Sequence, residues 1–277
     1  MTSPLVSIII TTKNEAAHIV SCLKSIRNQT CSDSETIVVD NQSKDSTKTI
    51  AKTFDAHVFN AGPERSAQRN YGAKKAKGEY LLFIDADMIL TPKVVEECVS
   101  KIRELRTANR ELRALVIPEK SIGIGFWAQC KAMERSFYEG VAWMEAARFY
   151  RKDIFMKIGT YDVHLTGPED FELPQRVKAM YGNSAVGRIT SYIVHDEGRI
   201  SLPKLLQKKY YYGRKMRRYQ LVTTSKKYFR KQANPLVRYA LFFRKPTRLL
   251  KDPIHALGMF IMKTLEILAL AYGGIKG

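Results

Sequence analysis

The chain has 277 residues, of which 45% are hydrophobic, and its formal net charge is +19 with a pI near 9.8. The length suits one large domain or two small ones with a real core, and the four cysteines form no C-x-x-C pair, which argues against a disulfide scaffold. The positive charge predicts an anionic partner: nucleic acid, membrane phosphates or a phosphorylated ligand. The first 15 residues read as neither a signal peptide nor a spanning helix.

Apolar strands and amphipathic helices alternate through the first half of the chain. The expected strands are residues 5–10, 36–39, 56–59, 80–84 and 115–117. The expected helices are residues 14–26, one that starts at 43–47, 65–76, and 91–106 with Pro92 at its first position. Strands that are apolar throughout are buried on both faces, so we expect an α/β fold with a doubly wound, mostly parallel sheet.

The second half has a mixed pattern and then a change in composition. We expect helices at 126–139 and 169–180, strands at 146–150 and 189–194, and a loop at 164–168. Residues 199–251 hold 17 Lys or Arg, six Tyr and no Asp or Glu. The sequence therefore predicts a catalytic domain at 1–198 and a basic, helical region at 199–277.

Polar side chains follow three of the predicted strands. They lie at Thr11–Glu15, at Asp40–Ser43 and at Asp85–Asp87. Ligands of doubly wound sheets bind beyond the carboxyl ends of the strands. We therefore expect these clusters to form one site.

The D-x-D of Asp85 and Asp87 follows a buried strand. Residues i and i+2 of a strand point to the same side, so both carboxylates can face one pocket. Two hard oxygen ligands suit Mg²⁺ or Mn²⁺, with water and ligand phosphates completing the shell. The alternative is a pair of solvated loop acids.

Two further segments before this strand suit a nucleotide. The Asp40 carboxylate can accept from a base N–H or a ribose hydroxyl, whereas capping of helices by Asn14 and Ser43 is the alternative. Arg65 and Arg69 lie four residues apart on one helix face, and their guanidinium groups suit phosphate or nucleobase oxygens. Surface ion pairing is the alternative for these two.

Two candidates lie in the second half. Glu169 and Asp170 open a helix after a Gly-Pro turn, so they are either capping residues or include a general base. His195 ends an apolar strand, as the D-x-D does. It is either a structural histidine or a metal ligand.

The four segments VSIIITTKNE, IVVDNQSKDST, GEYLLFIDADMIL and GPEDFEL together resemble the GT-A fold of family 2 glycosyltransferases. The resemblance covers about the first 200 residues, and the motifs occur in the family's order. It implies a nucleotide-sugar donor (a UDP- or GDP-sugar), a divalent metal and inversion at the anomeric carbon. Family members often carry Tyr at the position of Lys13 and Asp at the position of Asn41.

The resemblance also implies roles for individual residues. One set would contact the nucleotide sugar, and it consists of Thr11, Glu15, Asp40, Arg65 and Asp85, the last facing the ribose or a metal-bound water. Asp87 would bind the metal, His195 would complete the metal site, and Asp170 would be the catalytic base.

The basic region bears on the acceptor. Its interleaved Tyr, Lys and Arg suit either nucleic acid or an anionic membrane surface. In the last segment, Lys263 and Glu266 lie away from an apolar helical face formed by Leu257, Phe260, Ile261, Leu265, Leu268 and Tyr272. An amphipathic helix in the membrane interface fits this pattern best. Packing of this helix on the catalytic domain or on a second subunit stays open, and with it a homo-oligomer.

We therefore expect a peripheral enzyme on the cytoplasmic face of a membrane, with a lipid or lipid-linked acceptor and not a nucleic acid. Two other functions remain. A sugar-phosphate nucleotidyltransferase would carry a Gly-rich loop after the first strand, which TTKNE lacks. A non-catalytic nucleic-acid- or lipid-binding protein would not need Asp87 and Asp170.

Overall fold

The computed structural model describes residues 4–105 and 111–276 and divides into two compact units. Unit 1 comprises Met1–Pro118 and Ala146–Val194, and unit 2 comprises Glu119–Glu145 and His195–Gly277. The expected boundary at residue 198 lies close to the third and last crossing between units, at Val194 and His195. The sequence pattern did not show that residues 119–145 group with the C-terminal region.

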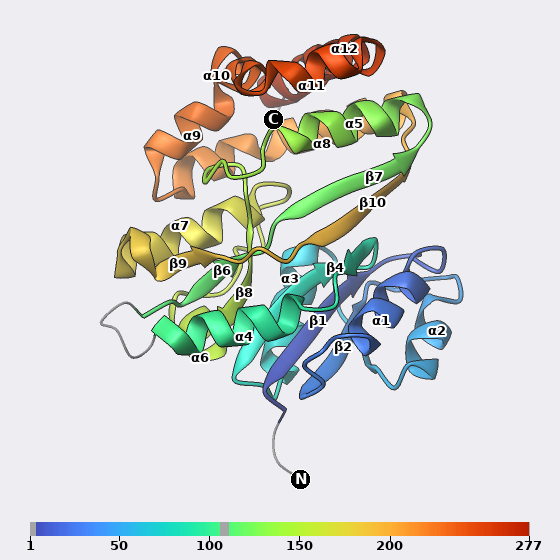
Figure 1. Cartoon of the computed structure of the whole chain (residues 1–277), viewed down its shortest axis with the longest axis vertical. Helices are drawn as coiled ribbons and strands as arrows, with labels where there is room; N and C mark the ends of the chain where they lie inside the picture. Colours follow the sequence, from blue (N-terminus) through green and yellow to red (C-terminus); the bar gives the residue numbers. More distant parts are fainter. Residues whose placement is uncertain (1–3, 106–110, 277) are drawn as a thin grey trace. The chain divides into compact units, whose positions relative to one another are not determined.

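Unit 1 contains a seven-stranded sheet with the strand order β3-β2-β1-β4-β8-β6-β9 (Figure 1). Neighbours among β1 to β4 pair in parallel, β8 runs antiparallel to β4 and β6, and β6 and β9 are parallel. The mostly parallel sheet confirms the predicted fold class. The strands of this sheet are β1 (Val6–Thr12), β2 (Ser34–Asp40), β3 (His57–Asn60), β4 (Tyr80–Asp85), β6 (Ala114–Val116), β8 (Ala147–Arg151) and β9 (Val186–Arg188).

Helices cover both faces of this sheet. The helices of unit 1 are α1 (Ile19–Arg27), α2 (Thr47–Thr53), α3 (Arg65–Lys75), α4 (Val94–Leu105), α6 (Lys152–Lys157) and α7 (Glu169–Tyr181). Alternate residues of β1 show the arrangement, since Ile8 and Ile10 pack in one core with α1, α2 and α4, and Ile9 packs in the other with α3, α6 and α7. Burial on both faces is the reason these strands are apolar throughout.

Several element boundaries differ from the prediction. Helix α1 begins at Ile19 and not at Asn14, because Asn14 has a φ of 57° and belongs to the turn after β1. Helix α4 begins at Val94, and Arg106, its predicted end, lies outside the described residues. The strand expected at 189–194 begins at Ile193, and three strands, β5 (Met88–Leu90), β7 (Glu119–Ile124) and β9, were not predicted.

Unit 2 is mostly helical and is built around two long helices. Its elements are β7 (Glu119–Ile124), α5 (Phe126–Ser136), β10 (Ile193–Arg199, which begins in unit 1), α8 (Leu202–Val222), α9 (Lys226–Ala233), α10 (Pro235–Ala240), α11 (Pro246–Lys251) and α12 (Pro253–Ile275). Strand β7 pairs with β10, and α12 packs along α8 and α5 (Figure 1). These contacts are why residues 119–145 group with the C-terminal region. Helix α5 ends three residues before its predicted end at 139.

Candidate active site

The strand ends of unit 1 carry the residues predicted to bind the ligand. In the parallel register of β1 with its two neighbours, Thr12 lies beside Asp40 and Thr11 lies beside Asp85. Glu15 follows β1 in the turn before α1. The fold therefore brings the predicted strand-end residues to one edge of the sheet, where doubly wound proteins bind ligands.

Asp40 is fully buried at the end of β2. Thr12 Oγ1 donates to Asp40 Oδ2 at 2.8 Å, and the backbone N–H of Ser43 donates to Asp40 Oδ1 at 2.7 Å. From α3, Gln68 Nε2 donates to the carbonyl oxygens of Thr12 and Val39 at 3.0 and 2.7 Å. These bonds fix the turns after β1 and β2. A contact of Asp40 with a nucleoside stays a prediction.

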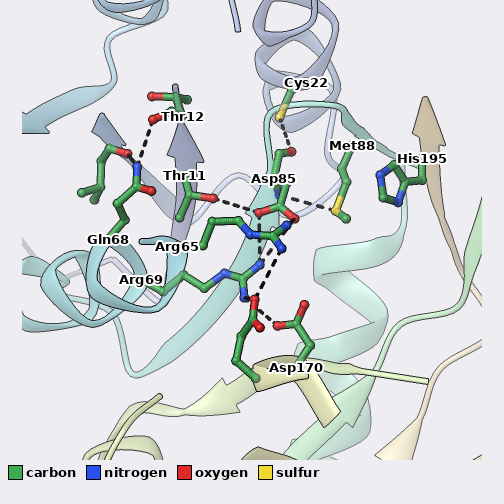
Figure 2. Close-up of polar contacts among 12 residues, drawn as sticks. Thr11, Thr12, Cys22, Arg65, Gln68, Arg69, Asp85, Met88, Asp170 and His195 are labelled. Atoms are coloured by element: carbon green, nitrogen blue, oxygen red, sulfur yellow. Dashed lines mark hydrogen bonds and ion pairs between the residues drawn. The ribbon is translucent and has the colours of Figure 1, made fainter. Parts of the chain in front are cut away.

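Arg69 joins the D-x-D strand to the helix that begins with Glu169 and Asp170 (Figure 2). Its side chain is fully buried, Nη2 donates to Asp85 Oδ1 at 3.1 Å, and Nη1 donates to Asp170 Oδ1 at 2.6 Å. Its guanidinium carbon lies 5.2 Å from the centroid of the Tyr161 ring. One guanidinium group therefore fixes two carboxylates that come from distant segments of the chain.

The carboxylate of Asp85 is bound by neighbouring side chains of the protein. Burial raises its pKa, but the charges of Arg69 and Arg65 outweigh burial and hold the pKa well below its usual range. Thr11 Oγ1 donates to Asp85 Oδ1 at 2.8 Å, and Arg65 Nη1 lies 3.5 Å from Oδ2. The division of roles, in which Asp87 and not Asp85 is the direct metal ligand, stays a prediction.

The two acids at the start of α7 have different environments. The Glu169 side chain is 1% exposed and the Asp170 side chain is 15% exposed. Burial and the charge of Asp170 raise the pKa of Glu169, and the charges of Arg65 and Arg69 oppose this rise. Arg65 Nη2 lies 3.5 Å from Glu169 Oε1. Of the two, Asp170 is therefore the more exposed acid.

Negative charge gathers near the end of β4. Burial raises the pKa of Glu15, a hydrogen bond with His18 lowers it, and the charges of Asp87 and Asp85 raise it again. Such a set of carboxylate oxygens fits Mg²⁺ or Mn²⁺, which relieves the repulsion and keeps water and phosphate among its ligands. Within the described residues, no three His, Cys, Asp or Glu side chains form a group that could hold a metal ion. A cation bound at these carboxylates would therefore need water and phosphate among its ligands.

His195 lies on β10 in unit 2, whereas Asp87 lies in unit 1, so their pairing as metal ligands stays a prediction. His195 Nδ1 lies 3.1 Å from Arg135 Nη1 and 3.3 Å from Glu119 Oε2. The two neighbours favour opposite tautomers, since Arg135 donates and Glu119 accepts. Only the tautomer that donates from Nδ1 to Glu119 leaves a lone pair on Nε2 for a metal.

The comparisons with known proteins agree with this architecture. The family described as "Glycosyl transferase family 2" matches residues 7–110. The chain is 34% identical over 119 residues to EpsH of Bacillus subtilis (strain 168), covering 40% of this chain and 32% of that one. It is 29% identical over 174 residues to a PGL/p-HBAD biosynthesis glycosyltransferase of Mycobacterium bovis (strain BCG / Pasteur 1173P2), covering 59% of this chain and 65% of that one. The chain thus spans about a third to two thirds of the length of these relatives.

A solved structure matches over nearly the whole chain. It is the mannosyltransferase PcManGT from Pyrobaculum calidifontis in complex with GDP-Man and Mn²⁺, with a TM-score of 0.61 and 14% identity, covering 99% of this chain and 88% of that one. At this identity the likeness concerns the fold, and it confirms the predicted GT-A fold. Residues 7–110 of the chain are thus similar to glycosyl transferase family 2.

Proposed function

We propose that this protein is an inverting glycosyltransferase that moves a sugar from a nucleotide-diphosphate sugar to an acceptor hydroxyl or phosphate. The observation that carries the proposal is the position of Arg69, whose guanidinium group binds both Asp85 at the strand end and Asp170 at the start of α7. A site that binds a donor and activates an acceptor needs these two segments in a fixed relation. A family 2 match over the D-x-D strand supports the same activity.

Asp170 is the proposed general base. Arg69 holds its Oδ1, so Oδ2 takes the proton from an acceptor hydroxyl as that hydroxyl attacks the anomeric carbon. Attack on the face opposite the leaving nucleotide inverts the anomeric centre, by the logic of an inverting glycosidase in which an alcohol replaces water. Buried Glu169 is not available for this step, and its Oε1 lies 3.5 Å from Arg65 Nη2.

The donor is a UDP- or GDP-sugar held at the ends of β1, β2 and β4. Thr11, Glu15, Asp40, Arg65 and Asp85 are the proposed contact residues, and GDP-Man in the related PcManGT structure supports this class of donor. Asp87 would hold Mg²⁺ or Mn²⁺, which supplies a Lewis acid for the charge that develops on the leaving diphosphate. The Mn²⁺ of the PcManGT complex supports a divalent cation of this type.

The acceptor we propose is a lipid or a lipid-linked glycan, used at the cytoplasmic face of a membrane. The composition of the C-terminal region supports this choice, since residues 199–277 hold 19 Lys or Arg and only two acids. A basic region of this kind is attracted to anionic lipid. Nucleic acid fits less well, because the exposed side chains of α12 are apolar.

A donor screen tests the proposal. Thermal shift and hydrolysis of UDP-, GDP- and dTDP-sugars are measured with Mn²⁺, with Mg²⁺ and with chelator. We expect one nucleotide class to stabilise and turn over only with the cation. A Lys157→Ala variant, altered at an exposed position of α6 outside the predicted site, serves as a control for general surface effects. No stabilisation and no turnover with any nucleotide sugar would contradict the proposal.

A further inference from the structure

Helix α12 carries its charges on the buried side and its large apolar side chains on the exposed side. Lys263 and Glu266, its only charged residues, are each 2% exposed. By contrast, Leu257 is 64% and Leu268 is 60% exposed. This arrangement is the reverse of a helix on the surface of a globular protein, whose polar face meets water.

The buried charges are paired within unit 2. Lys263 Nζ donates to Glu134 Oε1 of α5 at 2.5 Å and to Glu266 Oε2 at 3.1 Å. Lys131 of α5 donates to Glu266 Oε1 at 2.6 Å and also to Glu134. Burial raises the pKa of Glu266, but the charges of Lys209 and Lys263 outweigh burial and lower its pKa to about 2.

This network fixes which face of α12 points outwards. Removal of the helix from α5 would break the two buried ion pairs between the helices, Lys263 with Glu134 and Lys131 with Glu266, which is unfavourable. On the other side, α8 approaches closely, since a Cβ on Gly273 would lie 2.1 Å from the carbonyl oxygen of Tyr210. The helix is therefore held in place and cannot turn its apolar side inwards.

We define the apolar face of α12 as its exposed large side chains, which are 47–81% exposed: Ile254, Leu257, Ile261, Leu268, Tyr272 and Ile275. Their spacing of three, four and seven residues puts them on one side of the helix. The face extends over six turns, or about 30 Å at 1.5 Å per residue. No charged side chain of α12 interrupts it, because Lys263 and Glu266 lie on the other side.

The charges around this face indicate what covers it. Of the two acids in residues 199–277, Glu266 is buried, and Asp252 caps α12 by accepting from the backbone N–H of His255. The neighbouring helix α11 brings Arg248 and Lys251, and Lys276 follows the helix. A second copy of the chain would place one basic surface against another, whereas an anionic bilayer supplies both apolar contact and opposite charge.

We propose that the apolar face of α12 binds an anionic bilayer, with the helix lying in the plane of the membrane interface. In such a position the apolar side chains reach the boundary between headgroups and acyl chains, and Lys and Arg reach the lipid phosphates. By length and composition α12 is long and apolar enough to cross a membrane. The buried ion pairs with α5 oppose this, because a spanning helix would have to break them. Membrane binding by α12 rests on the proposed function for its biological purpose, and it identifies an anionic bilayer as the surface on which the enzyme acts.

A flotation assay with the full chain tests binding. Vesicles of phosphatidylcholine alone and of phosphatidylcholine with phosphatidylglycerol are compared at low and high salt. We expect the protein to float with the anionic vesicles and the double variant Leu257→Asp/Leu268→Asp to lose about tenfold or more of this partitioning. The matched control is Met180→Asp in unit 1, a 54% exposed apolar residue, which should float as the wild type does.

The depth of the helix separates the lying and spanning arrangements. Ile254→Trp and Tyr272→Trp place a fluorophore near each end of α12, and quenching by lipids brominated at different depths is measured after subtraction of the signal from Trp127 and Trp143. An in-plane helix predicts the same shallow depth at both ends. Different depths at the two ends would overturn the proposal in favour of a spanning helix.

Two other results would also overturn it. One is flotation of the double variant equal to that of the wild type. The other is a wild-type dimer, seen by light scattering, that the double variant converts to monomer without any change in flotation. Hydrolysis of the nucleotide sugar in detergent-free buffer is measured for all variants and should not change. Loss of wild-type turnover with normal flotation would contradict the proposed function alone, so the two failures are distinguishable.

Discussion

Replacement of Arg69 by methionine is the sharpest structural perturbation of the proposed site. Arg69 is fully buried, and the carboxylates that it binds, Asp85 and Asp170, are 14% and 15% exposed. Removal of one partner from a buried ion pair costs about 3–5 kcal/mol, and the partial exposure of the two acids favours the lower end, about 3 kcal/mol. For a protein of this size that corresponds to a melting temperature lower by roughly 6–12 °C.

The same substitution should lower activity because it displaces Asp170, and not because Arg69 contacts the substrate. Without Arg69, Asp170 is no longer held against the D-x-D strand, and a misplaced catalytic group costs about 100-fold in turnover. We expect kcat for transfer to fall by about this factor while KM for the donor changes little. Arg69→Lys should also be impaired, because one ammonium group cannot reproduce contacts made by two guanidinium nitrogens.

Arg65→Lys is the matched control for stability alone, because Arg65 is itself a proposed donor contact; its side chain is 38% exposed and its ion pairs are 3.5 Å long. Its cost should stay below about 1 kcal/mol. Thermal unfolding and steady-state kinetics of the three variants are compared under one set of conditions. If Arg69→Met unfolded at the wild-type temperature and retained wild-type turnover, Arg69 would not join the two segments in the way described.

Three other predictions concern separate parts of the chain. Gly213→Ala places a Cβ 2.1 Å from the carbonyl oxygen of Leu270, so we expect the free energy of unfolding in urea to fall by about 1–3 kcal/mol. In the control Gly274→Ala, the nearest atom to the new Cβ lies at 3.7 Å, so this variant should be as stable as the wild type or more stable. Equal effects of the two substitutions would refute the close contact between α8 and α12. Burial raises the pKa of Glu97, but hydrogen bonds from Thr190 and Ser191 outweigh burial and lower the pKa from 4.5 to about 2. Ionised Glu97 therefore stabilises the folded state fully above pH 4.5, and this stabilisation is lost as the pH falls towards 2. Glu97→Gln should therefore cost about 1–2 kcal/mol at neutral pH, after allowance for solvent screening, and almost nothing near pH 2, and a cost independent of pH would contradict this. Asp87→Asn should abolish the stimulation of donor hydrolysis by Mn²⁺ in a metal titration, and unchanged metal dependence would exclude Asp87 as the ligand.

The sheet of unit 1 was predictable because its strands are buried on both faces. Strands β1, β2 and β4 are apolar runs in the sequence for that reason. The position of the site followed from the same fact, since the carboxyl ends of parallel strands meet at one edge. Strand β7 was missed because its residues alternate between partly buried and exposed, and EKSIGI is not an apolar run.

Contacts between distant residues could not be read from the sequence. The four-residue spacing of Arg65 and Arg69 indicated a shared helix face, but the partner of Arg69 on α7 is 101 residues away. The orientation of α12 is a similar case. Its apolar periodicity was visible, whereas the burial of Glu266 depends on Lys131, which is 135 residues away in the sequence.

Single-turnover transfer by Asp170→Asn tests the central claim most directly. The substitution keeps the shape of the side chain but removes the base, and an amide oxygen can still accept from Arg69. We predict that donor binding, measured by calorimetry with Mn²⁺, stays within about threefold of the wild type, while transfer falls by about 100-fold or more. Transfer at the wild-type rate would contradict the assignment of Asp170 as the base and, with it, the account of how this site works.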